Sequence, residues 1–156
     1  MFNPSRQDAR RFFFDIWSKH KAQETLGDLE RQTLAILMAH PEYQAIVDHP
    51  EQYLEQEWPP ELGQTNPFLH MSLHLAIEEQ RSIDQPFGIR SLYAQLALRL
   101  GDEHAAQHAM MDCLAEMIWQ AQRAQTPPDV NVYLNAVRAR LGLSAEDTPR
   151  PRLDEL

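Results

Sequence analysis

The sequence contains very little cysteine, few basic residues and no long apolar segment. Its single cysteine, Cys113, excludes an intramolecular disulfide and favours a reducing compartment. No apolar run approaches the roughly 18 residues that a membrane span needs, and the first residues do not resemble a signal peptide. The 14 Lys and Arg against 23 Asp and Glu give a formal net charge of −9, which opposes binding to phosphate backbones and anionic membranes. We therefore expect a cytoplasmic protein that contacts neither nucleic acid nor membrane.

Residues that favour β-strands are also scarce. Val, Ile and Thr together supply 16 residues and glycine supplies 5, whereas Leu, Ala and Gln supply 19, 17 and 14. No segment alternates polar and apolar residues over a strand's length, and no Asn-Gly or Asp-Gly hairpin turn lies between apolar runs. The composition predicts an all-α protein, a single-domain bundle of five to six helices.

Prolines and capping residues divide the chain into the expected helices. Asn66 before Pro67 is a strong helix start, because Asn caps the helix and proline fits its first position. Gly101 suits a helix end and Asp102 the next start. Pro41 and Pro50 each begin a short helical turn, and residues 58–65 form a loop. The main helices are expected near residues 4–21, 25–40, 67–81, 88–100, 102–124 and 129–141. They make up a domain over residues 1–143, followed by a flexible polar tail at 144–156.

Four of the seven histidines form two pairs with the same spacing. His70 and His74 lie on one expected helix, and His104 and His108 lie on another. Spacing of four residues places both imidazoles of a pair on one helix face, one turn apart. Such a pair can hold a transition-metal ion, because the helix already fixes the direction of two ligands.

Acidic residues continue both stripes at the same spacing. Glu78 follows His74, and Asp112 follows His108. Across two facing helices this would give a site for one or two metal ions, built from His70, His74, Glu78, His104, His108 and Asp112. Zn, Fe, Mn or Ni would suit such ligands. An open coordination position could activate water or, with iron, engage oxygen.

The pattern has a partial similarity to the central ligands of hemerythrin-type bundles. That arrangement also needs an earlier histidine, for which His20, His40 or His49 could serve. It further needs a later His-x-x-x-x-Asp, but no histidine follows His108. An intact oxygen-carrying di-iron centre is therefore not expected.

A non-metal interpretation stays open beside this one. Histidines near an apolar helix face commonly serve only as hydrogen-bonded packing residues or surface groups. The protein would then act without catalysis, through a helical surface that binds a partner of unknown identity or through a homo-oligomer. Cys113 lies on an apolar helix face and is expected in the core rather than as a nucleophile. Motifs for nucleotide binding, serine hydrolysis and dithiol redox chemistry are absent from the sequence.

Several longer strings carry a resemblance to a known family. They are Phe2–Arg6, Ala9–Phe14, His40–Tyr43, Asn66–His70, Leu73–Gln80, Asp84–Arg90, His104–His108 and Cys113–Arg123. With these strings the chain resembles an uncharacterised bacterial family, domain of unknown function 1841 (DUF1841), and the similarity covers nearly the whole chain except the tail. The resemblance implies a small cytoplasmic protein of proteobacteria and carries no established activity.

Overall fold

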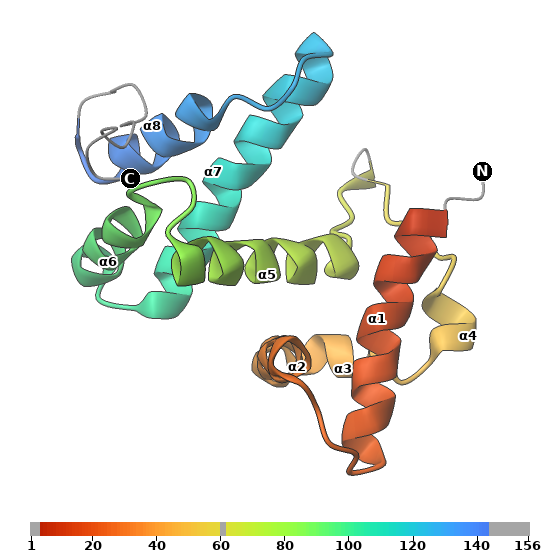
Figure 1. The fold of residues 1–156 in the computed structure, drawn as a ribbon. Coiled ribbons are helices and arrows are strands. Elements are labelled where there is room, and N and C mark those ends of the chain that lie inside the picture. The colour runs from red at the N-terminus through yellow and green to blue at the C-terminus, as the bar shows by residue number, and fades with distance from the viewer. Residues whose placement is uncertain (1–3, 60–61, 144–156) are drawn as a thin grey trace. The chain divides into compact units, whose positions relative to one another are not determined.

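The structure is a computed structural model that describes residues 4–59 and 62–143. Over these residues it is all-α and contains no strand, as the composition predicts. The predicted tail at 144–156 lies outside the described residues. The helices are α1 (Pro4–Lys21), α2 (Asp28–Ala39), α3 (Pro41–Val47), α4 (Pro50–Tyr53), α5 (Pro67–Ile83), α6 (Ile89–Leu100), α7 (Glu103–Ala124) and α8 (Val130–Arg140) (Figure 1).

The predicted number of five to six helices is wrong, since the described residues form eight, seven of them at least seven residues long. The difference arises at Pro41 and Pro50, where the expected short turns are separate helices, α3 and α4. Proline fits the first position of a helix because its missing N–H would have no helical partner there. Each proline therefore starts a helix of its own.

The main helix boundaries agree with the sequence pattern except at the start of α2. This helix begins at Asp28 instead of residue 25, because Gly27 is its N-cap and the side chain of Glu30 bonds back to the Gly27 backbone. The Glu30 carboxylate accepts a hydrogen bond from the Gly27 N–H at 3.0 Å. The expected cap at Asp102 is confirmed, since its side chain accepts from the backbone N–H groups of His104 and Ala105.

The chain divides into two compact units, Met1–Leu75 and Ala76–Leu156, with the division inside α5. In the first unit, α1 packs on α2 and α3 (Figure 1). Its core contains Phe13, Ile16, Leu37 and Met71, each at most 2% exposed. These residues come from α1, α2 and α5, so that burial of apolar surface joins three helices.

Arg10 is a fully buried cation in the first unit. Its guanidinium donates hydrogen bonds to the backbone carbonyls of Tyr53, Leu54 and Gln56, at 2.8–3.1 Å. It also lies over the rings of Trp58 and Phe68, 5.1 and 4.9 Å from their centroids. Burial lowers the Arg10 pKa, and the charge of Arg6 adds to this effect. The end of α4 and the following segment are thus tied to α1.

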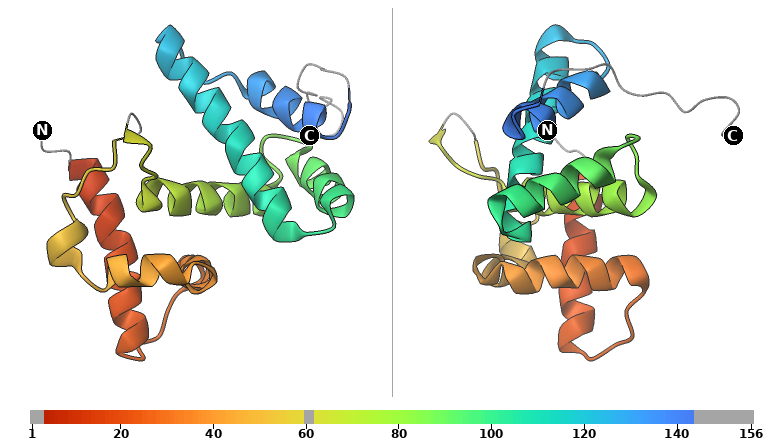
Figure 2. Two further views of the ribbon diagram at one scale, coloured as in Figure 1. Left: turned by 180° about the vertical axis from the view of Figure 1, so that it is seen from behind. Right: turned by 90° about the vertical axis from the view of Figure 1, so that its left-hand side faces the viewer.

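The second unit is built around α7. Helices α6 and α8 both pack on α7 and also contact each other (Figure 2). Met110, Leu134 and Val137 are completely buried among these helices. Cys113 is 3% exposed, which confirms its expected place in the core, and burial raises the pKa of its thiol. None of the described helices is both long enough and apolar enough to cross a membrane.

Candidate metal centre

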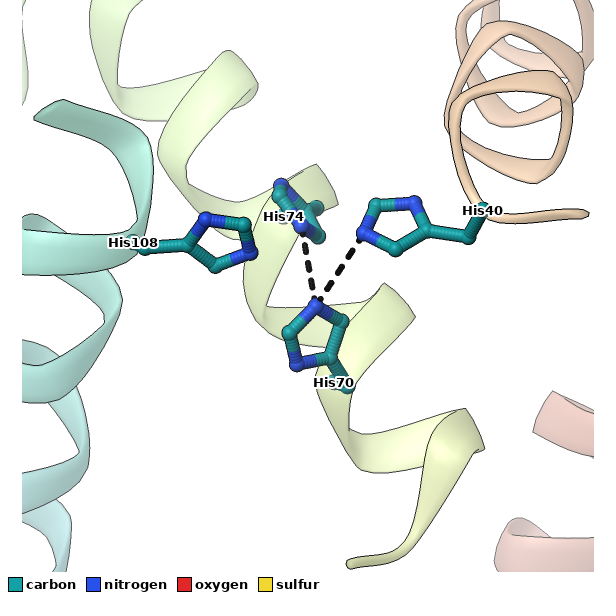
Figure 3. Close-up of side chains that lie close together, drawn as sticks. All are labelled: His40, His70, His74 and His108. Carbon is teal, nitrogen blue, oxygen red and sulfur yellow. Dashed lines mark hydrogen bonds between the residues drawn. The ribbon is translucent and has the colours of Figure 1, made fainter. Parts of the chain in front are cut away.

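Three histidines of the first unit converge on one point. His40 lies between α2 and α3, while His70 and His74 lie one turn apart on α5. The Nε2 atom of His70 is 3.3 Å from Nε2 of His40 and 3.1 Å from Nε2 of His74 (Figure 3). Each of the three side chains offers a nitrogen within 4.8 Å of the others. His74 and His40 are buried, 3% and 6% exposed, and His70 is half-buried.

Local sequence explains the position of each ring. Pro41 begins α3, so that α2 ends at Ala39 and His40 stands at the junction of the two helices. Asn66 caps α5 by accepting hydrogen bonds from the backbone N–H groups of Phe68 and Leu69. The spacing of His70 and His74 then places both rings on one face of α5.

A backbone contact selects the tautomer of His40. Its Nδ1 lies 2.8 Å from the carbonyl oxygen of Ile36, and a carbonyl can only accept, so Nδ1 carries the proton. In the neutral imidazole, Nε2 then presents its lone pair toward His70 and His74. Metal-bound histidines in proteins are generally held in this way, with the other ring N–H donated to a carbonyl or carboxylate.

The spacing of the nitrogens matches that of ligands around a small metal ion. Two nitrogens about 2.05 Å from a tetrahedral ion lie about 3.3 Å from each other, close to the observed 3.3 and 3.1 Å. Hydrogen bonds between the rings alone account less well for the close approach of the three Nε2 atoms. The single Nε2 of His70 holds either one proton or one lone pair, yet it faces two other Nε2 atoms. A cation at the centre would interact favourably with all three lone pairs.

Tyr43 of α3 adjoins two of these rings. It stacks on His40 at a centroid separation of 5.3 Å and an interplanar angle of 7°, and its ring lies edge-on to His70 at 5.7 Å. The half-buried position of Tyr43 raises the pKa of its hydroxyl, and the charge of Glu42 adds to the effect. This stacking contact restricts the orientation of the His40 ring.

Of the six predicted ligands, His70 and His74 belong to this cluster. Glu78, on the part of α5 in the second unit, accepts hydrogen bonds from Arg81 at 3.0 Å and from Gln107 of α7. Asp112 is exposed and forms an ion pair with Arg140 at 3.7 Å. Their predicted role as metal ligands stays a prediction.

The second predicted pair lies on α7. The rings of His104 and His108 meet edge to face, with centroids 4.1 Å apart. His104 is exposed and His108 is half-buried. Both belong to the second unit, and their predicted role as metal ligands stays a prediction.

The sequence pattern of paired histidines did not single out His40. It was one of three possible earlier histidines, and the other two have different surroundings. His20 packs against the ring of Trp17 at 5.4 Å, and His49 is exposed and pairs with Glu51 at 3.4 Å. The available signal was the position of His40 directly before a helix-starting proline, which fixes its backbone at a helix junction.

Comparison with known proteins gives a family and no further relative. No curated protein and no solved structure shows significant similarity to the chain. The model of one protein family matches residues 5–139, nearly the whole of the described chain. The protein therefore belongs to the family described as domain of unknown function (DUF1841).

Proposed function

We propose that this protein binds one transition-metal ion through His40, His70, His74 and His108. The observation that carries the proposal is the convergence of the Nε2 atoms of His40, His70 and His74, with Nδ1 of His40 bonded to the Ile36 carbonyl. Three converging imidazoles, one of which has a fixed tautomer, form most of a metal site before the ion arrives.

His108 is assigned as the fourth ligand on separate grounds. Its neighbour Gln107 donates a hydrogen bond to Glu78 within the second unit, and Glu78 stands one turn after His74 in α5. His108 is half-buried, and its imidazole is the same type of ligand as the other three. Four neutral nitrogens would complete a tetrahedral site.

The ligand chemistry limits which ion fits. Imidazole suits Zn, Cu, Fe and Ni, whereas Mn and Mg prefer carboxylate, carbonyl and water oxygens. Neutral ligands leave the full positive charge on the ion, which strengthens its action as a Lewis acid on any further ligand. Zn, Fe or Ni is therefore favoured over Mn among the metals expected from the sequence.

In this proposal Glu78, His104 and Asp112 are not ligands. Glu78 already contacts Arg81 and Gln107, and Asp112 pairs with Arg140. Their substitution tests the assignment directly. The variants Glu78→Gln, His104→Ala and Asp112→Asn should bind metal with nearly the affinity of the wild type.

Metal analysis of protein purified without a histidine tag tests the function. We expect close to one metal ion per chain, and loss of that metal in the double variant His74→Ala/His108→Ala. A metal content below about 0.1 per chain, with thermal stability unaffected by chelator or added Zn²⁺, would overturn the proposal. The protein would then be a non-catalytic helical interaction protein or a homo-oligomer.

A further inference from the structure

A pocket of about 260 Å³ lies beside the histidine cluster in the first unit. Three of its lining side chains are apolar: Trp58, Leu69 and Leu73. Three others, Gln64, Thr65 and Asn66, are polar and uncharged, and His70 completes the wall. We call this the His70 pocket. Because His70 also contacts His40 and His74, one side chain belongs to both the pocket and the histidine cluster.

The walls of the His70 pocket are held in place by neighbouring contacts. The Trp58 ring stacks on Tyr53 at a centroid separation of 6.3 Å and meets Phe68 edge-on at 5.7 Å, with Arg10 over it. Leu69, His70 and Leu73 come from the first two turns of α5, whose start Asn66 caps. A pocket with supported walls can bind a ligand without a large cost of ordering.

The lining indicates the class of ligand. The described lining residues include no Asp, Glu, Lys or Arg, so that nothing in this wall would offset the desolvation of a charged group placed against it. An indole ring with two leucines suits a flat apolar ring. The volume lies just below the range of about 300–1,000 Å³ typical of pockets for drug-sized molecules, so the ligand is smaller than these.

We propose that the His70 pocket binds a small molecule that carries an uncharged ring and an oxygen donor, and that the oxygen coordinates the metal beside His70. This inference rests on the proposed metal function. The ring would lie against Trp58, Leu69 and Leu73, and Gln64 and Thr65 supply groups for further hydrogen bonds. Coordination numbers above four, which transition metals and even Zn can adopt, accommodate the added donor.

The experiment uses the full chain loaded with Co²⁺, whose visible absorption reports its coordination. The Co²⁺ titration alone tests the proposed function. Benzohydroxamic acid, acetohydroxamic acid and 4-carboxybenzohydroxamic acid are then added as probes with the same oxygen donors. We expect benzohydroxamic acid to change the spectrum and to bind at least tenfold more tightly than the analogue without a ring and the analogue with a charged group on its ring.

Two matched variants locate the probe. Leu69 is 56% exposed, so that Leu69→Trp fills the pocket without disturbing the core, and Leu98 of α6 is 85% exposed and lies in the second unit. Leu69→Trp should lower the affinity for benzohydroxamic acid at least tenfold, while the affinity for Co²⁺ changes less than twofold. Leu98→Trp should alter neither.

The outcomes separate the two proposals. If Co²⁺ fails to bind the wild type, the proposed function fails and this inference falls with it. If Co²⁺ binds but the three probes bind equally well, only the inference about the pocket is overturned. The same holds if Leu69→Trp leaves the affinity for benzohydroxamic acid unchanged. If Leu69→Trp also loses Co²⁺ binding, the comparison of the three probes on the wild-type protein tests the inference about the pocket. Equal binding of the three probes would then overturn it.

Discussion

The ring Nδ1 of His40 donates a hydrogen bond to the backbone carbonyl of Ile36, one turn earlier in the chain, at 2.8 Å. This contact directs the lone pair of the opposite nitrogen toward His70 and His74. It orients the His40 imidazole before any ion binds, since its tautomer is set by the backbone.

Substitution of His40 should therefore impair metal binding severely. We expect His40→Ala to lower Zn²⁺ affinity at least 100-fold, because one direct ligand is lost. Competition with a chromophoric chelator gives the affinity. His20→Ala and His49→Ala are the matched controls, since both residues were equal alternatives in the sequence, and each should stay within about threefold of the wild type. A larger loss for His49→Ala than for His40→Ala would refute the assignment.

Metal binding should also stabilise the fold. A ligand at 100 times its Kd stabilises the folded state by about 2.7 kcal/mol, which for a chain of this size corresponds to a rise in Tm of about 5–10 °C. Calorimetry with and without Zn²⁺ measures the shift, and EDTA should reverse it. The double variant His40→Ala/His74→Ala should show no shift, and a shift of equal size in that variant would assign the effect to other residues.

Arg10 should contribute to stability through its three carbonyl partners. Arg10→Met retains apolar volume but leaves the carbonyls of Tyr53, Leu54 and Gln56 without this donor. We expect the free energy of unfolding to fall by about 1–3 kcal/mol. The neighbouring Arg11 is exposed and contacts Asp8 at 3.5 Å. Arg11→Met should therefore change the free energy of unfolding by no more than about 0.5 kcal/mol. Equal effects in urea unfolding would contradict the structural role of Arg10.

Tyr133 of α8 should make the second unit sensitive to alkaline pH. Burial raises the pKa of its hydroxyl far above the ordinary value of 10.0, with Cys113 adding to the effect, and the hydroxyl donates to Gln80 at 2.6 Å. The folded state retains a proton that the unfolded chain loses. The protonated Tyr133 hydroxyl therefore makes its full contribution to the free energy of unfolding below pH 10, and this contribution decreases as the pH rises above 10.

Removal of this hydroxyl separates the two contributions of Tyr133. At neutral pH, Tyr133→Phe should cost about 1 kcal/mol through the lost hydrogen bond. Between about pH 9 and pH 11, the variant should lose less stability than the wild type. Urea unfolding at both ends of this range tests the expectation, and equal losses in both proteins would show that Tyr133 does not carry the effect.

The helices could be predicted from local chemistry, whereas the cluster could not. Asn66-Pro67 and Gly101-Asp102 mark helix ends by interactions within a few residues, so the sequence alone locates them. The pair His70 and His74 is also local, because helix geometry fixes its spacing. His40 joins that pair only through packing of segments 30 residues apart, and no short-range pattern contains this information.

The late start of α2 shows a similar limit on a smaller scale. The sequence pattern predicts a start near Thr25, but the hydrogen bond from the Gly27 N–H to the Glu30 carboxylate sets the first turn at Asp28. Glycine has no side chain that could accept the reciprocal hydrogen bond, so the usual capping-box pattern, with Ser or Thr at that position, does not appear in the sequence.

Metal stoichiometry of the untagged protein tests the central claim most directly. Titration of metal-free protein with Co²⁺ should reach an end point at one ion per chain, with the intense visible absorption of a tetrahedral site. His40→Ala, His70→Ala and His74→Ala should each abolish that spectrum. A wild-type protein that shows no such absorption, or a spectrum that persists in all three variants, would contradict the account.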